Sequence, residues 1–106
     1  MSRAFRRFEI LLPQQFNNGD QVPPTAFEDT LRELRERFGG VSAETQDIQG
    51  YSVHQGKPFS DDLVRLYVDV PDTAENRQYF AKLKGVLKQR FQQVEIWIAT
   101  HPVDVL

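Results

Sequence analysis

Hydrophobic and polar residues alternate along three stretches of the chain, which is the period expected of half-buried β-strands. The first stretch is Phe8–Leu12, and Pro13 ends it. The second is Val64–Val70, and the third is Val94–Ala99 with Pro102 shortly after it. We therefore predict strands at these three places.

Two other stretches repeat hydrophobic residues every three or four positions, as one face of an α-helix does. The first set is Phe27, Leu31, Leu34 and Phe38, and the second is Phe80, Leu83, Leu87 and Phe91. Thr25 and Glu28 fit a capping box at the start of the first helix, and Gly39 ends it. Asp72 or Thr73 predicts the N-cap of the second helix.

The segment 41–53 has the least regular pattern. Ile48, Tyr51 and Val53 indicate a strand there, with Gly50 as a candidate bulge. The stretch His54–Pro58 contains Gly56, a residue that tolerates left-handed backbone geometry. It therefore predicts the tip of a hairpin that leads into the next strand.

The resulting order is strand, helix, strand, strand, helix, strand, which resembles the split βαβ arrangement of ferredoxin-like domains. We predict one α+β domain over residues 1–106 with a ferredoxin-like βαββαβ fold. Its four-stranded antiparallel sheet carries both helices on one face, and right-handed crossovers place the first and third strands in the centre. The second face of the sheet is then open.

Composition excludes several classes of protein. A length of 106 residues fits one domain, and the absence of cysteine excludes disulfides and thiolate zinc sites. The first residues are positively charged, but Arg6, Arg7 and Glu9 interrupt the apolar stretch that a signal peptide needs. No apolar run reaches the length of a membrane span. We therefore expect a soluble, cytoplasmic protein with no membrane partner.

The net charge of −2 lacks the basic excess of most nucleic-acid-binding proteins, so we do not expect nucleic acid as a partner. Every charged residue between positions 77 and 90 is nevertheless positive. These residues are Arg77, Lys82, Lys84, Lys88 and Arg90. A solvent-exposed helix face, with cations near the helix C-terminus, explains this run better than a binding stripe does.

The alternation directs one set of strand side chains towards the helices and the other set to the open face. The second set is Glu9, Leu11, Arg65, Tyr67, Asp69, Glu95, Trp97 and Ala99. A sheet face that carries Leu11, Tyr67 and Trp97 among charged residues is the most informative functional feature of the sequence.

Three interpretations of this face stay open. The chain's own tail, residues 101–106, or the loop around Phe16 covers its aromatic residues; or two copies stack these faces in a homodimer; or the aromatic residues stack on RNA bases. The acidic Glu9, Asp69 and Glu95 disfavour RNA because they repel phosphate. We expect the homodimer, and with it a binding or interaction module.

The alternative is a small-ligand enzyme or sensor with a pocket near Arg65, Tyr67, Trp97 and His101, with Tyr51 and His54 as weaker candidates. Arg65 would contact an anionic or aromatic ligand, and a histidine would transfer a proton. The sequence contains neither a nucleophile motif nor a metal-ligand spacing. We therefore favour a protein that is not an enzyme, and we expect no catalytic residue, metal or cofactor.

Overall fold

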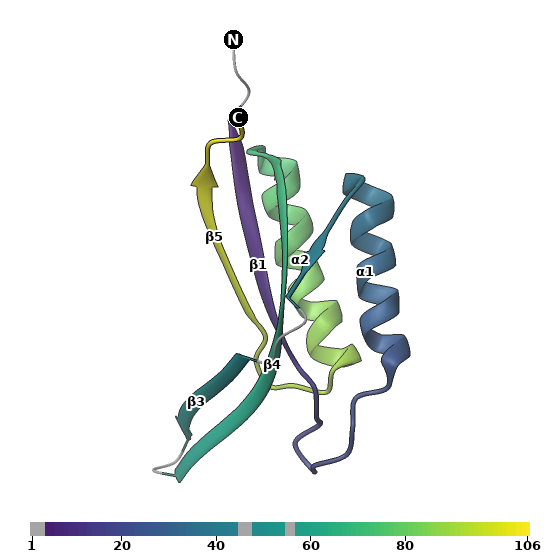
Figure 1. Cartoon of the computed structure of the whole chain (residues 1–106), viewed down its shortest axis with the longest axis vertical. Coiled ribbons are helices and arrows are strands. Elements are labelled where there is room, and N and C mark those ends of the chain that lie inside the picture. The colour runs from purple at the N-terminus through teal and green to yellow at the C-terminus, as the bar shows by residue number, and fades with distance from the viewer. Residues whose placement is uncertain (1–3, 45–47, 55–56) are drawn as a thin grey trace.

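The computed structural model describes residues 4–44, 48–54 and 57–106. Its elements, in chain order, are β1 (Phe5–Pro13), α1 (Pro24–Phe38), β2 (Ser42–Ala43), β3 (Ile48–His54), β4 (Lys57–Pro71), α2 (Ala74–Arg90) and β5 (Trp97–Val103). Both helices lie on the same side of one antiparallel sheet (Figure 1). Neither helix of the described part is long and apolar enough to cross a membrane.

The sheet has the strand order β2, β4, β1, β5, so the two central strands are β1 and β4. β1 pairs with β4 from Phe5 opposite Pro71 to Pro13 opposite Leu63. On its other side β1 pairs with β5, which lies at an edge of the sheet. This is the ferredoxin-like α+β fold that the sequence predicts, with the predicted strands in the centre.

The second strand of the predicted pattern is divided into β2 and β3, and both pieces pair with β4. The register changes between the pieces, because Ser42 lies opposite Tyr67 whereas Ile48 lies opposite Leu63. β3 then pairs without interruption to its end, so the candidate bulge at Gly50 is wrong and the irregularity comes earlier in the chain.

β3 and the first half of β4 form a two-stranded arm that leans away from the helices (Figure 1). β4 is long enough for this because it has 15 residues, of which only the second half pairs with β1. The strands of the arm end with His54 opposite Lys57, as a hairpin requires. Residues 55–56 of the predicted tip lie outside the described residues.

The core lies between the helices and the sheet face that they cover. Its most deeply buried members are Ile10, Leu12, Leu34, Leu66, Val70, Phe80, Leu87, Phe91 and Ile96. The ring of Phe8 stacks on that of Phe80 with 4.0 Å between the centroids and an interplanar angle of 8°. The predicted inward positions of β1 and of the second half of β4 are thus confirmed, with Val64 only partly buried. Each such side chain contributes about 1.5–3 kcal/mol through burial.

The last strand differs from the prediction at both ends. Val94, expected to point inward, is 85% exposed, because the chain turns after α2 with Gln92 at a φ of 51° and β5 begins only at Trp97. β5 also continues past Pro102 to Val103. A proline is tolerated there because an edge strand leaves half of its backbone groups unpaired.

The predicted capping box of α1 is wrong, whereas the predicted end of this helix and the N-cap of α2 are confirmed. α1 begins at Pro24 with Pro23 as N-cap and no side-chain capping hydrogen bond; a proline is favoured at the first helical position because its φ is already helical. Gly39 ends α1 with a φ of 84°. The hydroxyl of Thr73 caps α2 by accepting a hydrogen bond from the Asn76 N–H.

Candidate functional site: the open sheet face

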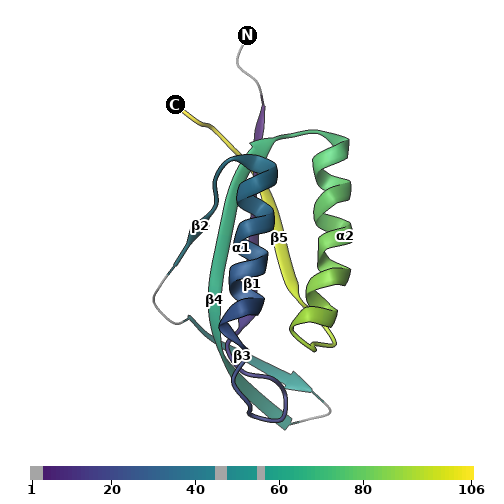
Figure 2. The same cartoon turned by 90° about the vertical axis from the view of Figure 1, so that its right-hand side faces the viewer.

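The side of β5, β1 and β4 that faces away from the helices is the candidate site, and we call it the open face. In Figure 2 the helices lie in front of the sheet, so the open face points away from the viewer. Strand pairing arranges its side chains in rows that run across the three strands. From the arm outward, the rows are Trp97, Leu11 and Arg65; Ala99, Glu9 and Tyr67; His101, Arg7 and Asp69; Val103, Phe5 and Pro71. The two end rows are mainly apolar, and the two middle rows carry most of the charge.

All five of the stronger candidates from the sequence lie on the open face. Leu11, Arg65 and Trp97 share one row, and Tyr67 lies in the next. His101 is four residues beyond Trp97 on β5, which corresponds to about 13 Å along the strand. The candidates therefore share a surface without converging on one point.

Trp97 is the most exposed aromatic side chain of the face. It is 65% exposed, so the C-terminal tail does not cover it. Phe16, the other proposed cover, packs against the hydrophobic core on the helix side. For Trp97, the interpretation in which the tail or the loop around Phe16 covers the aromatic residues is therefore wrong.

The weaker candidates Tyr51 and His54 lie in β3, on the arm. Tyr51 is opposite Ser60, which is five residues before Arg65 along β4, and His54 lies further out. The backbone thus places both on the arm, beyond the row of Trp97, Leu11 and Arg65, and their side chains lie outside the described part of the protein.

An ion pair joins β1 to β4 in the third row. The Arg7 guanidinium donates from Nε and Nη2 to the two carboxylate oxygens of Asp69, at 2.7 and 3.0 Å. The same guanidinium lies over the ring of Tyr67, 4.6 Å from its centroid. The hydrogen bond from Arg7 lowers the pKa of Asp69, which keeps this carboxylate charged to a lower pH than usual.

Arg65 forms the second ion pair, with Glu44 just after β2, at 3.0 Å between Nη1 and Oε1. Its Nε is buried and has no hydrogen-bond partner among the described residues. By contrast, none of the ion pairs formed within the described residues involves Glu9. The middle of the open face therefore holds one acidic side chain without an ion pair in the described part of the chain.

The hollow that Tyr67 lines differs from the pocket expected near Arg65, Tyr67, Trp97 and His101. Tyr67 lines a hollow of about 340 Å³ at the β2 edge, and the other lining residues are Phe38, Gly40, Val41, Ser42, Val68 and Asp69. Arg65, Trp97 and His101 are not among them.

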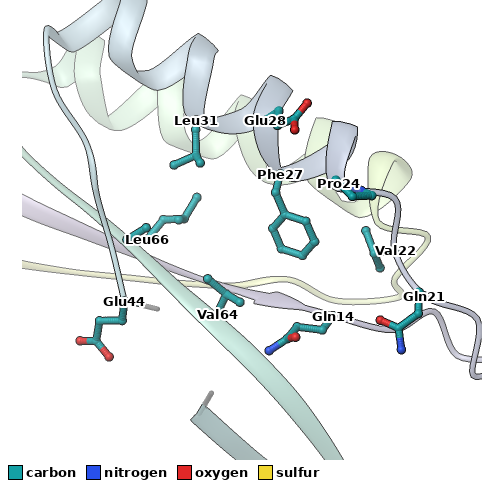
Figure 3. Close-up of a pocket in the computed structure, with 11 residues that line it drawn as sticks. Gln14, Gln21, Val22, Pro24, Phe27, Glu28, Leu31, Glu44, Val64 and Leu66 are labelled. Atoms are coloured by element: carbon teal, nitrogen blue, oxygen red, sulfur yellow. The ribbon is translucent and has the colours of Figure 1, made fainter. Parts of the chain in front are cut away.

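A larger groove, of about 490 Å³, lies on the opposite side of the sheet, between α1 and β4. Figure 3 shows Phe27 and Leu31 reaching from α1 towards Val64 and Leu66 of β4. The sequence pattern does not indicate this groove, because it places all four residues on faces where a helix and a strand pack together. Ala43 of β2 and the following Glu44 also line this groove. No group of three or more potential metal ligands lies among the described residues.

The sequence matches no protein-family model and no curated protein. Solved structures with the same fold include the divalent cation tolerance protein Cut A1 from Thermus thermophilus, with 17% identity and a TM-score of 0.65 over 95% of this chain and 85% of that one. CutA from Synechococcus elongatus PCC7942 has 10% identity and a TM-score of 0.62 over 96% of this chain and 79% of that one.

A third similar structure is a phage SAM lyase in complex with S-methyl-5'-thioadenosine. It has 11% identity and a TM-score of 0.68 over 99% of this chain and 92% of that one. Because these identities are low and the fold serves many unrelated functions, the likeness establishes the ferredoxin-like fold alone.

Proposed function

We propose that this protein is a binding module that works as a homodimer assembled through its open face. The observation that carries the proposal is the 65% exposure of Trp97, beside Leu11, on a sheet face that neither helix covers. A large aromatic side chain gains free energy when its apolar surface leaves water, and tryptophan is enriched in protein interfaces. A second copy presents the same surface and can cover it.

Both arginines of the open face have an anionic partner within one chain. Arg7 and Arg65 are already paired with Asp69 and Glu44 within one chain. A partner that covers these pairs therefore removes matched charges from water, which costs less free energy than burying an isolated ion.

The size of the face sets the expected strength of the dimer. Three to four strands at about 4.8 Å spacing, with outward side chains over about 20 Å of strand, cover roughly 300–400 Å² per copy, so two copies bury roughly 600–800 Å² together. This is below the roughly 1,200–2,000 Å² of stable specific interfaces, so we expect a weak dimer that dissociates on dilution, with a Kd of roughly micromolar or above.

The test is light scattering and Trp97 fluorescence over a dilution series. We expect twice the chain mass of 12.3 kDa at high concentration and a red shift of the emission as the dimer dissociates. Trp97→Ala should give a monomer with an unchanged circular dichroism spectrum. The matched control is Val86→Ala, which removes a 46% exposed apolar side chain from α2 and should leave the dimer intact. A wild-type monomer at all concentrations overturns the proposal.

A second candidate function is the binding of a compact apolar ligand in the groove between α1 and β4. Its volume of about 490 Å³ is in the range of small-molecule sites, and Phe27, Leu31, Val64 and Leu66 give it apolar walls. The phage SAM lyase, solved with S-methyl-5'-thioadenosine, shows that a protein of this fold can hold a small ligand. This candidate keeps the small-ligand function but places it away from Arg65, Tyr67, Trp97 and His101.

The two candidates are separable by mutation. Ala43 lines the groove from the exposed β2, so Ala43→Trp should obstruct the groove with little effect on the core. Binding of the fluorescent apolar probe anilinonaphthalene sulfonate should then fall, and Trp97→Ala should leave it unchanged. Equal binding by the wild type and by Ala43→Trp would exclude the groove.

A further inference from the structure

The open face is complementary to itself in one particular orientation. Along β1 its outward side chains are Phe5, Arg7, Glu9 and Leu11, and the midpoint of this set is at the level of Phe8. Arg7 and Glu9 lie one position on either side of the midpoint and have opposite charges. Phe5 and Leu11 lie at the two ends, and both are apolar.

We propose that the two copies stack with a two-fold axis in the plane of the interface, across the strands at the level of Phe8. This inference rests on the proposed homodimer and specifies its geometry. The axis reverses the order of the rows, so β1 of one copy runs antiparallel over β1 of the other. Arg7 then lies over the partner subunit's Glu9, and Glu9 lies over the partner subunit's Arg7, so the symmetry makes this contact twice.

The same operation matches the remaining rows. Leu11 lies over Phe5 of the partner subunit, and Trp97 lies over the partner subunit's Val103, so apolar residues meet at both ends of the interface. The ends are about 20 Å apart along the strands. In the middle, the Tyr67 hydroxyl faces the partner's Asp69, whose carboxylate can accept a hydrogen bond from it.

The other face-to-face arrangement with two-fold symmetry has its axis along the strands. That axis places each row over the equivalent row of the second copy, so Arg7 meets the partner subunit's Arg7 and Glu9 meets the partner subunit's Glu9. Like charges placed together in an interface are unfavourable. Glu9 forms no ion pair within the described part of its own chain, and of the two arrangements only the crossed one brings the partner subunit's Arg7 over this carboxylate.

The decisive variants reverse charge at these two positions. Glu9→Arg places like charges at both central contacts, and we expect its dimer to be at least about tenfold weaker. Glu9→Gln removes the attraction without adding repulsion, and it should weaken the dimer less. The complementary variant is Arg7→Glu combined with Asp69→Asn, because the second change avoids two adjacent carboxylates within the chain. Asp69→Asn alone is its control and should remain dimeric.

Mixing gives a test that does not depend on loss of function. Glu9→Arg and the Arg7→Glu/Asp69→Asn variant should each be monomeric and folded by circular dichroism. Their mixture should form a one-to-one heterodimer in native mass spectrometry, because opposite charges then meet at both contacts. We expect much less heterodimer when either variant is mixed with Asp69→Asn, because like charges then meet at one of the two contacts.

The outcomes separate this inference from the proposed function. A wild-type monomer overturns both. If Trp97→Ala is monomeric while Glu9→Arg dimerises as strongly as the wild type, the open face is an interface but the crossed arrangement is overturned. A mixture that forms no heterodimer, or a wild-type mass of three chains, also overturns the crossed arrangement.

Discussion

Arg7 and Asp69 lie directly opposite each other on β1 and β4, and two hydrogen bonds of 2.7 and 3.0 Å join their side chains. The strand register holds both backbones in place, so the pair forms at the cost of side-chain entropy alone. Arg7 in turn lies over Tyr67, at 4.6 Å from the ring centroid. Three residues of the open face are thus held in position by one another within a single chain.

Asp69→Asn should make the protein less stable at pH 7 but not in acid. The hydrogen bond from Arg7 lowers the pKa of Asp69, so the charged carboxylate favours the folded state. This contribution is complete above the unfolded pKa of about 3.9 and is lost as the pH falls through the lower folded pKa. Because Asp69 is 29% exposed, we expect a loss of about 0.5–1 kcal/mol at pH 7.

Urea unfolding of wild type and Asp69→Asn at pH 7 and at pH 2 measures this difference. The protein concentration should be below the Kd of the dimer, so that dimerisation does not contribute to the measured free energy of unfolding. A difference of equal size at both pH values would contradict the role of the ion pair.

Thr73→Ala should destabilise the protein by about 1 kcal/mol, because it removes the hydroxyl that caps α2. Thr25→Ala is the matched control at the start of α1, where no side chain makes a capping hydrogen bond. We expect this control to change the free energy of unfolding by less than about 0.5 kcal/mol. Chemical denaturation of both variants decides the point, and equal losses would restore the capping box at Thr25.

Gly85→Ala should stabilise the protein by about 0.5–1 kcal/mol. Gly85 is inside α2, and a Cβ added there meets no atom within 4 Å, so alanine gains helix propensity without a steric penalty. The matched control is Gly39→Ala, which should be destabilising because Gly39 has a φ of 84°. The two midpoints of thermal unfolding should move in opposite directions; a shift of both in the same direction would refute the argument.

The sequence predicts most of the fold because its periodic patterns are clear where one face of an element is buried. Phe8–Leu12 of β1 and Leu66–Val70 of β4 alternate as predicted because both strands are central and helices cover one face only. The N-cap at Thr73 and the end of α1 at Gly39 are also predicted correctly, because these signals are local and their hydrogen-bond partners are within a few residues.

The errors fall where geometry depends on distant parts of the chain. The division of the second strand into β2 and β3 is set by pairing with β4, and no local pattern marks a change of register there. Likewise Val94 fits an alternating pattern, but the turn that ends α2 delays β5 until Trp97. The groove beside Ala43 depends on how α1 lies over β4 and β2, which is a long-range property, so the sequence pattern could not show it.

The open face is predictable only in part, because alternation is a local property and strand register is not. Alternation alone assigns Leu11, Tyr67 and Trp97 to one side of the sheet. Which residues lie next to one another depends on the register across β5, β1 and β4, and this is a long-range property. The pairing of Arg7 with Asp69, and the lack of an ion pair to Glu9 among the described residues, therefore emerge only from the structure.

The two helices are joined by a side-chain interaction near the end of α2. Arg90 reaches across to α1 and donates from Nη2 and Nη1 to the carboxylate oxygens of Glu33, at 2.7 and 3.0 Å. Its Nη1 also donates to the Thr30 hydroxyl at 2.9 Å, and Thr30 is fully buried. This hydroxyl in turn donates to the Ala26 carbonyl, so the network ends in the backbone of α1.

Arg90→Lys should therefore destabilise the protein by about 1–2 kcal/mol, although the charge is kept. A lysine ammonium cannot make two parallel hydrogen bonds to Glu33 and also reach Thr30, and the Arg90 side chain is only 20% exposed. The matched control is Arg32→Lys, in a pair with Asp29 whose side chains are 50% and 44% exposed. That pair is well solvated, so its replacement should cost less than about 0.5 kcal/mol. Urea unfolding of both variants measures the difference, and equal costs would show that the contact between α1 and α2 does not depend on the guanidinium geometry.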